Sequence, residues 1–275
     1  MTEVFEAALN AIGSKVPLSD NAYMGADGFL HCSVCHAKTQ TRIVVEALGI
    51  DKIVPCICDC KMKEVAAENM RKKQEEYDRK RRICFAETNM ASWTFENDDR
   101  KNSIISDAMQ RYVDGFSKYM KEGKGLLLHG TVGTGKTYFA ACIANRLIDR
   151  GYNVLMTNFA RLSNQIQGTF EKQELIDSLN DYHLIVIDDL GAERKSEYMQ
   201  EMVFNIIDSR YRSGRPFIIT TNLSIDEIKK PQEVSYARIY DRLLQRCFPI
   251  EVSGVSRRRQ EVKDTYLNMK SELGL

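Results

Sequence analysis

The segment GTVGTGKT, which runs from Gly130 to Thr137, constrains the fold of this chain more than any other feature. It fits the pattern G-x-x-x-x-G-K-[ST] and lies between a short apolar run, GLLLH, and the helical pattern KTYFAACIANRLIDRG. A strand that passes through such a turn into a helix directs backbone N–H groups and the positive end of the helix dipole at a phosphate. The segment therefore predicts a P-loop inside an α/β domain.

The residue types of this loop predict contacts with ATP and Mg²⁺. Its glycines let the backbone turn N–H groups toward the phosphates. Lys136 brings a positive charge to the outer phosphates, and Thr137 offers a hydroxyl to Mg²⁺. The predicted nucleotide-binding residues of the loop are Gly130, Thr131, Val132, Gly133, Thr134, Gly135, Lys136 and Thr137.

Polar residues at the ends of two later apolar runs extend this site. In LIVIDDL, Asp188 is predicted to hold Mg²⁺ through its water shell and Asp189 to polarise the attacking water, with Glu193 as an alternative. Many ATPases carry Glu at the second position, so the shorter Asp189 predicts slow turnover. In ITTN, Asn222 is predicted to orient the water or to sense the γ-phosphate.

From Cys84 onward, strand-like and helix-like stretches alternate, which predicts a mainly parallel sheet. Strands are expected at GLLLH, YNVLMTN, YHLIVIDDL, PFIITTN and FPIEVS. The preceding stretch, KMKEVAAENMRKKQEEYDRKRRICF, lacks Gly and Pro and alternates in charge sign. It favours an exposed helical connector over a basic surface for DNA or a partner. We predict a cysteine-rich domain at residues 1–61, a helical linker at 62–84 and an ATPase domain at 85–275.

Sequence and composition limit where the protein can reside and which partners it can have. The first residues lack the basic and apolar regions of a signal peptide, and no apolar run approaches the roughly 20 residues of a membrane helix. We therefore expect a cytoplasmic protein with no membrane partner. The net charge is +1, so any contact with nucleic acid must use a local basic patch.

Five of the eight cysteines lie in CSVC and CICDC, near the N-terminus. Two thiolate pairs separated by a loop predict a tetrahedral structural Zn²⁺ site, which can hold a small domain together where the apolar core is thin. The predicted zinc ligands are Cys32, Cys35, Cys58 and Cys60, with Cys56 as an alternative in the second pair. The flanking His31 and His36 are not needed. The scattered Cys84, Cys142 and Cys247 are expected to be buried and inert.

With these residues in hand, positions 85–262 resemble the ATPase domain of bacterial and phage replicative helicase loaders of the DnaC/DnaI type, in the AAA+ class. The matching segments, in order, are GLLLHGTVGTGKTYFAACIANRLI, VLMTNFARL, LIVIDDLGAER, FIITTNL, RIYDRLLQRC and VSGVSRRR. The resemblance implies a parallel five-stranded sheet in which an extra strand separates the two phosphate-site strands. It also implies assembly into an open or spiral homo-oligomer.

The resemblance gives roles to two arginines. In the family, an arginine on the helix before the last strand reaches the γ-phosphate of the neighbouring subunit. The matching residue is Arg242, with Arg238 and Arg246 as alternatives one helical turn away. Arg258 matches the arginine that contacts phosphate within the same subunit. A planar, permanently charged guanidinium suits both roles, and the first requires a head-to-tail interface.

The function that the resemblance implies is ATP-dependent delivery of a hexameric, DnaB-type replicative helicase onto single-stranded DNA during replication initiation. Some such loaders grip the helicase with a zinc-containing N-terminal domain. Arg161 and Lys172 are possible DNA contacts. Two alternatives remain open. One is an IstB-like transposition helper ATPase, which would engage double-stranded DNA and a transposase. The other is a non-catalytic nucleotide switch or zinc adaptor.

Overall fold

The computed structural model describes residues 22–86, 89–193 and 196–274. The chain divides into two compact units, residues 1–76 and 77–275, and the division falls inside helix α2 (Asp59–Phe85). The first residues, where no signal peptide was expected, lie outside the described ranges. Within those ranges, no helix is both long and apolar enough to cross a membrane.

The first unit consists of two antiparallel strand pairs and the start of α2. The elements are β1 (Ala22–Met24), β2 (Leu30–Cys32), β3 (Gln40–Val45), the short 3-10 helix η1 (Glu46–Leu48) and β4 (Ile50–Pro55). Strand β1 pairs with β2, and β3 pairs with β4. Among its described residues the buried apolar side chains are Cys32, Ile50 and Cys58. Because isolated two-stranded hairpins are only marginally stable in water, so thin a core needs a further cross-link.

The second unit is built on a parallel sheet of five strands, in the order β6-β7-β8-β5-β9. The strands are β5 (Gly125–His129), β6 (Val154–Asn158), β7 (Leu184–Leu190), β8 (Phe217–Thr221) and β9 (Cys247–Glu251). All five were expected from the sequence, and their parallel pairing is confirmed. Strand β8 separates β5 from β7, as the resemblance implied.

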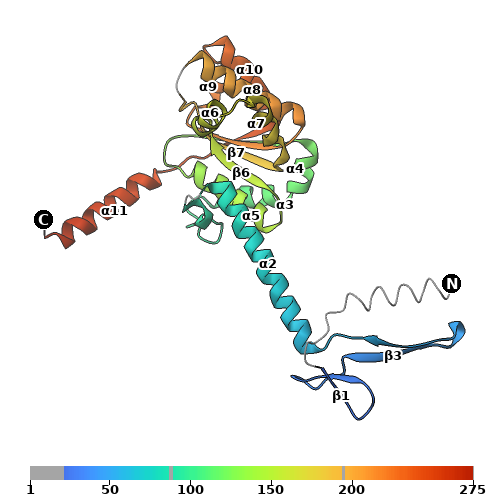
Figure 1. The fold of residues 1–275 in the computed structure, drawn as a ribbon. Helices are drawn as coiled ribbons and strands as arrows, with labels where there is room; N and C mark the ends of the chain where they lie inside the picture. Colours follow the sequence, from blue (N-terminus) through green and yellow to red (C-terminus); the bar gives the residue numbers. More distant parts are fainter. Residues whose placement is uncertain (1–21, 87–88, 194–195, 275) are drawn as a thin grey trace. The chain divides into compact units, whose positions relative to one another are not determined.

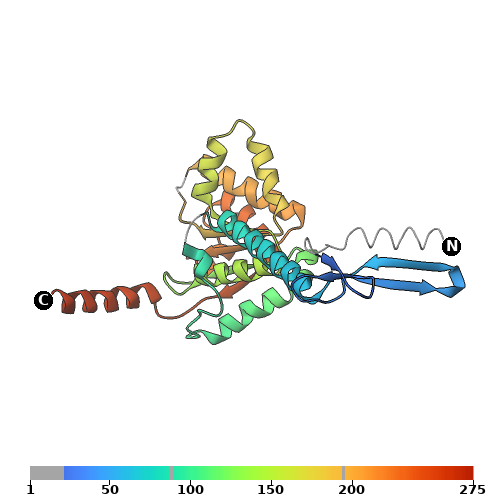
Figure 2. The same ribbon diagram turned by 60° about the horizontal axis from the view of Figure 1, so that its bottom comes forward.

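Helices cover both faces of this sheet (Figures 1 and 2). The helices are η2 (Asn89–Ser92), α3 (Ser103–Asp114), α4 (Phe116–Glu122), α5 (Lys136–Asp149), α6 (Phe159–Gln167), α7 (Lys172–Ser178), η3 (Leu179–Asp181), α8 (Glu197–Ser213), α9 (Ile225–Lys229), α10 (Val234–Arg246) and α11 (Arg257–Glu272). The sequence analysis gave no element for the segments that form α3, α4 and α9.

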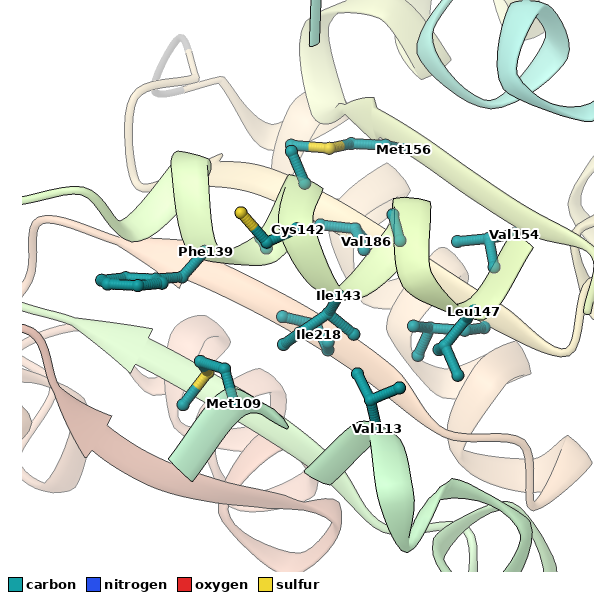
Figure 3. Packing of buried hydrophobic residues seen from close by; sticks show 14 of the residues in the cluster. Met109, Val113, Phe139, Cys142, Ile143, Leu147, Val154, Met156, Val186 and Ile218 are labelled. Atoms are coloured by element: carbon teal, nitrogen blue, oxygen red, sulfur yellow. The ribbon is translucent and has the colours of Figure 1, made fainter. Parts of the chain in front are cut away.

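Side chains along each strand point alternately to the two faces of the sheet, and this divides the core into two layers. In β5, Leu126 and Leu128 pack against α3 and α5, while Leu127 packs on the other face with α6, α8 and α10. Figure 3 shows the first layer, where Ile143 and Leu147 of α5 lie over the sheet beside Val113 of α3. Because both faces are covered, the strands read as continuous apolar runs.

The three scattered cysteines belong to the second unit and are buried, as expected. Burial raises the pKa of the Cys84 and Cys142 thiols to about 12, and it raises the pKa of the Cys247 thiol further still. Figure 3 shows Cys142 on α5 within this core layer. These thiols are therefore held in the unreactive protonated form.

Candidate functional site

The P-loop joins β5 to α5 at the carboxyl edge of the sheet. Gly133 in this loop adopts a left-handed conformation (φ 85°), and a Cβ there would lie 2.1 Å from Ser256 Oγ. The backbone N–H of Arg257 donates to the carbonyl of Gly133 at 2.9 Å. The segment that leads into α11 thus closes directly on the loop, and only glycine fits between them.

Lys136 is the first residue of α5 and is 5% exposed. Its Nζ donates to the carbonyls of Gly130 (2.9 Å) and Thr131 (2.8 Å) and to Oδ1 of Asn222 (2.8 Å). Burial lowers the pKa of this lysine, while the charges of Asp189 and Asp188 oppose that shift. Because all three acceptors are neutral, the ammonium has no ion-pair partner in direct contact, and its charge suits a phosphate.

A β-bulge presents the two acidic residues at the end of β7. In the pairing of β7 with β8, Ile187 lies opposite Ile219 and Leu190 opposite Thr221, so Asp188 and Asp189 together face Thr220. Asp189 has a left-handed backbone (φ 57°), a conformation that Asp tolerates better than most residues. Consecutive side chains of a regular strand point to opposite faces, and the bulge relaxes that rule here.

The carboxylate of Asp188 lies in a setting that favours a bound cation. Burial raises the pKa of Asp188 and the charge of Asp189 adds to that rise, whereas hydrogen bonds from Thr220 and Thr137 oppose it. Burial and a neighbouring carboxylate both disfavour the ionised form of a carboxyl group. A bound divalent cation offsets both effects and stabilises that ionised form. Thr137 and Asp188, the pair predicted to hold Mg²⁺, are therefore in contact.

A cavity of about 570 Å³ opens beside these residues. Its phosphate end is lined by Lys136, Thr137, Asp189, Asn222 and Arg258. Arg258 carries the charge that lowers the pKa of both Lys136 and Asp188, so its guanidinium faces the same space. Most of the residues predicted to act on nucleotide in the same subunit thus line one cavity, whereas Gly130, Thr131, Thr134 and Asp188 are not part of its wall. Among the residues described, Glu193 is not part of its wall.

The other end of the cavity was missed by sequence reasoning. It is lined by Asn89, Trp93, Asn97 and Tyr138. The rings of Trp93 and Tyr138 lie 5.8 Å apart, and the Tyr138 hydroxyl donates to the carbonyl of Thr94 at 2.9 Å. Aromatic faces with nearby amides suit a planar, hydrogen-bonding base. The available signal was that Trp93 is the single tryptophan of the chain.

Arg242 lies elsewhere in the same unit. It forms an ion pair with Asp208, whose Oδ1 lies 2.8 Å from Arg242 Nη2, and its guanidinium lies 4.4 Å from the centre of the Phe204 ring. It borders a separate hollow of about 390 Å³, together with the exposed Arg238. Arg246 donates to the carbonyl of Tyr211 at 3.1 Å. None of these three arginines lines the nucleotide cavity of its own subunit among the residues described.

The first unit gathers the four cysteines that were named as zinc ligands. The sulfur atoms of Cys32, Cys35, Cys58 and Cys60 all lie within 4.8 Å of one another. Cys60 Sγ is 3.2 Å from Cys58 Sγ and 3.4 Å from Cys32 Sγ. A tetrahedral site with Zn–S bonds of about 2.3 Å implies sulfur separations of roughly 3.8 Å, so this set fits zinc. Cys56 Sγ instead donates to the carbonyl of Lys38 at 3.5 Å.

The surroundings of this cluster favour a thiolate at Cys32, whereas the neighbouring sulfurs of Cys58, Cys32 and Cys35 raise the pKa of the Cys60 thiol to about 12. Backbone N–H groups of Cys35 and Val34 lower the pKa of the Cys32 thiol to about 6. The ring of His31 is engaged on both nitrogens, by the carbonyl of His36 and by Asp27, each at 2.9 Å. The two histidines are therefore outside the sulfur cluster, as expected.

Comparison with known proteins agrees with this geometry. The family model described as IstB-like ATP binding protein matches residues 58–265. This chain belongs to that family. Its residues are 27% identical to the replicative helicase loader DnaI of Bacillus subtilis over 277 aligned positions, which cover 93% of this chain and 84% of the relative. The replicative helicase loader DnaC of Escherichia coli K12 is 31% identical over 146 positions, covering 51% of this chain and 57% of DnaC.

A crystal structure of DnaI is also similar, with a TM-score of 0.50 and 29% identity, covering 61% of this chain and 92% of that one. The fold and the family make this chain an ATP-binding protein of the AAA+ class. The family match begins at residue 58, whereas the alignment with DnaI covers too much of the chain to begin after Cys32. The aligned span therefore includes the positions of the four clustered cysteines in this chain.

Proposed function

We propose that this protein loads a hexameric replicative helicase onto single-stranded DNA and that it hydrolyses ATP in doing so. The observation that carries this proposal is the similarity to a protein named replicative helicase loader across both units. Similarity confined to the ATPase domain would favour a loader and a transposition helper equally. An alignment that extends over the unit with the cysteine cluster favours the loader.

Four residues that line the cavity, together with Asp188 beside it, would bind Mg²⁺·ATP and direct its hydrolysis. The metal ion neutralises phosphate charge when it is bound. Lys136 holds the outer phosphates, and Thr137 with Asp188 provides the oxygen ligands that Mg²⁺ prefers. Asp189 orients a water at the phosphate end. Asn222, which already contacts the Lys136 ammonium, reports on the outer phosphate.

Arg258 would contact phosphate in cis and Arg242 in trans. Arg258 lines the cavity of its own subunit, whereas Arg242 borders a different hollow. A guanidinium outside the nucleotide cavity of its own subunit would act on phosphate in a neighbouring copy of the chain. Full activity therefore requires a head-to-tail homo-oligomer.

Single-stranded DNA would contact the α6–α7 region. Arg161 on α6 and Lys172 on α7 are exposed, and Phe170 between these helices is fully exposed at 107% of its reference area. An aromatic face beside basic side chains is the combination that stacks a base and attracts its phosphate without reading sequence. Phe170 was not identified from the sequence.

The first unit would grip the helicase. Zinc held by the four sulfurs would supply the stability that its apolar core lacks. Val44 and Ile53 are exposed on one face of the β3–β4 hairpin, since Arg42 lies opposite Ile53 and Val44 opposite Asp51. An exposed apolar pair flanking the Arg42–Asp51 ion pair suits a protein partner.

Reconstitution tests this proposal. The zinc-loaded full chain is mixed with the purified replicative helicase of its source cell, and complexes are measured by light scattering after gel filtration. We expect a stable complex with the wild-type chain and none with Cys58→Ser, while Cys56→Ser binds like wild type. Absence of a complex, with selective binding of a transposase to the same chain, would replace the loader with the transposition helper.

A further inference from the structure

Thr220 is the residue that joins the sensor strand to the acidic pair. It lies on β8 and is 0% exposed. Its hydroxyl donates to Oδ1 of Asp188 at 2.6 Å and accepts from the backbone N–H of Asp189 at 2.9 Å. One hydroxyl therefore uses both its donor and an acceptor site on the two residues of the β7 bulge.

The position of Thr220 in the strand links it to the P-loop. Side chains two residues apart project from the same side of an extended chain, so Asn222 follows Thr220 on that side. Asn222 Oδ1 accepts from Lys136 Nζ at 2.8 Å. The hydroxyl of Thr137, the neighbour of Lys136, also acts on Asp188 and opposes the burial-driven rise in its pKa. Two contacts from β8 thus hold both halves of the phosphate site.

We propose that Thr220 is a positioning residue that fixes Asp188 and Asp189 for Mg²⁺ and water. The hydroxyl anchors one oxygen of Asp188, which sets the plane of that carboxylate against Thr137. It also satisfies the N–H of Asp189 in the left-handed conformation that directs this residue to the cavity. The proposal rests on the Mg²⁺·ATP site proposed above and adds a residue to it.

The adjacent Thr221 provides a matched control. It is also 0% exposed, and its hydroxyl donates to the carbonyl of Leu190 at 2.6 Å and accepts from the N–H of Leu223 at 3.1 Å. Each threonine thus makes one donated and one accepted hydrogen bond in the same strand. Replacing either by valine removes a hydroxyl of equal burial, but only Thr220 contacts the acidic pair.

The experiment measures binding of a fluorescent ATP analogue to the full chain, first in EDTA and then across a Mg²⁺ titration, with turnover recorded in parallel. Groups that orient metal ligands typically contribute about 10–100-fold to metal affinity or activity. For Thr220→Val we expect about a 10-fold or larger rise in the Mg²⁺ concentration at half-effect, with binding in EDTA unchanged. Thr220→Ser should stay within about twofold of wild type, because it keeps the hydroxyl.

Thr221→Val should respond to Mg²⁺ like wild type, and a thermal melt of each variant confirms folding. An unchanged Mg²⁺ dependence in Thr220→Val, an equal shift in Thr221→Val, or failure of Thr220→Ser to restore it would each overturn the proposal. A chain that shows the Thr220 effect but loads no helicase would refute the loader and leave this role intact. If nucleotide binding by the wild-type chain did not depend on Mg²⁺, both the proposed Mg²⁺·ATP site and the proposed role of Thr220 would be refuted.

Discussion

Asp208→Asn should destabilise the ATPase unit, because Asp208 is the buried anchor of Arg242. Asp208 lies on α8 at 4% exposure and forms ion pairs with Arg212 and with Arg242. Breaking a fully buried ion pair from one side costs about 3–5 kcal/mol, whereas an exposed pair contributes about 0–1 kcal/mol. The side chains of Arg242 and Arg212 are 26% and 76% exposed, so an intermediate loss of about 2 kcal/mol is expected.

The assay is thermal and urea unfolding of the full chain, followed by a signal from the ATPase unit. A loss of about 2 kcal/mol should lower Tm by about 4–8 °C in a domain of this size. Asp241→Asn is the control, since Asp241 is an exposed acid on α10 that pairs only with Gln245 among the described contacts. It should change stability by less than about 0.5 kcal/mol.

A double-mutant cycle with Arg242→Met isolates the pair. Met keeps an apolar stem over Phe204 while the charge is lost, so the cycle reports on the ion pair more than on packing. We expect a coupling energy of about 1 kcal/mol or more between the two positions. A Tm for Asp208→Asn equal to wild type, or effects that simply add, would refute the argument that Asp208 holds Arg242.

Four further predictions concern variants in the two units. Lys136→Ala should abolish binding of a fluorescent ATP analogue while the zinc content, measured by metal analysis, stays at one ion per chain; parallel loss of zinc would contradict two independent units. Arg242→Ala should keep nucleotide binding but lose the rise of specific turnover with protein concentration, and an unchanged rise would exclude a trans role. Cys58→Ser should lose zinc and Cys56→Ser should keep it; the reverse result would reassign the second ligand pair. Phe170→Ala should weaken binding of single-stranded DNA by about 1–3 kcal/mol with the salt dependence preserved, and equal affinity would exclude stacking.

Much of the ATPase fold could be predicted from local patterns. Apolar runs followed by turn residues locate all five strands, since strands covered on both faces carry few polar residues. The P-loop pattern locates the β5–α5 junction, because the residues that bind phosphate there are neighbours in the sequence. The order of the strands came from the resemblance, since crossovers leave little local signal.

The parts that the sequence did not predict depend on contacts between distant segments. Trp93, which follows η2, and Tyr138, on α5, meet at the cavity although they are 45 positions apart in the sequence. Thr220 reads as an ordinary β-branched strand residue, and its role depends on a bulge in the neighbouring β7. The second cysteine pair was predicted as Cys58 and Cys60 with Cys56 left as an alternative, because spacing does not tell which sulfur turns toward Cys60.

The most direct test of the account is a loading assay on closed circular single-stranded DNA with an annealed oligonucleotide. The replicative helicase of the source cell is added with ATP, with and without this protein, and displacement of the oligonucleotide is measured. The account predicts displacement that depends on this protein and is lost with Lys136→Ala and with Cys58→Ser. Displacement that is equal with and without the protein, at helicase concentrations where loading is limiting, would contradict it.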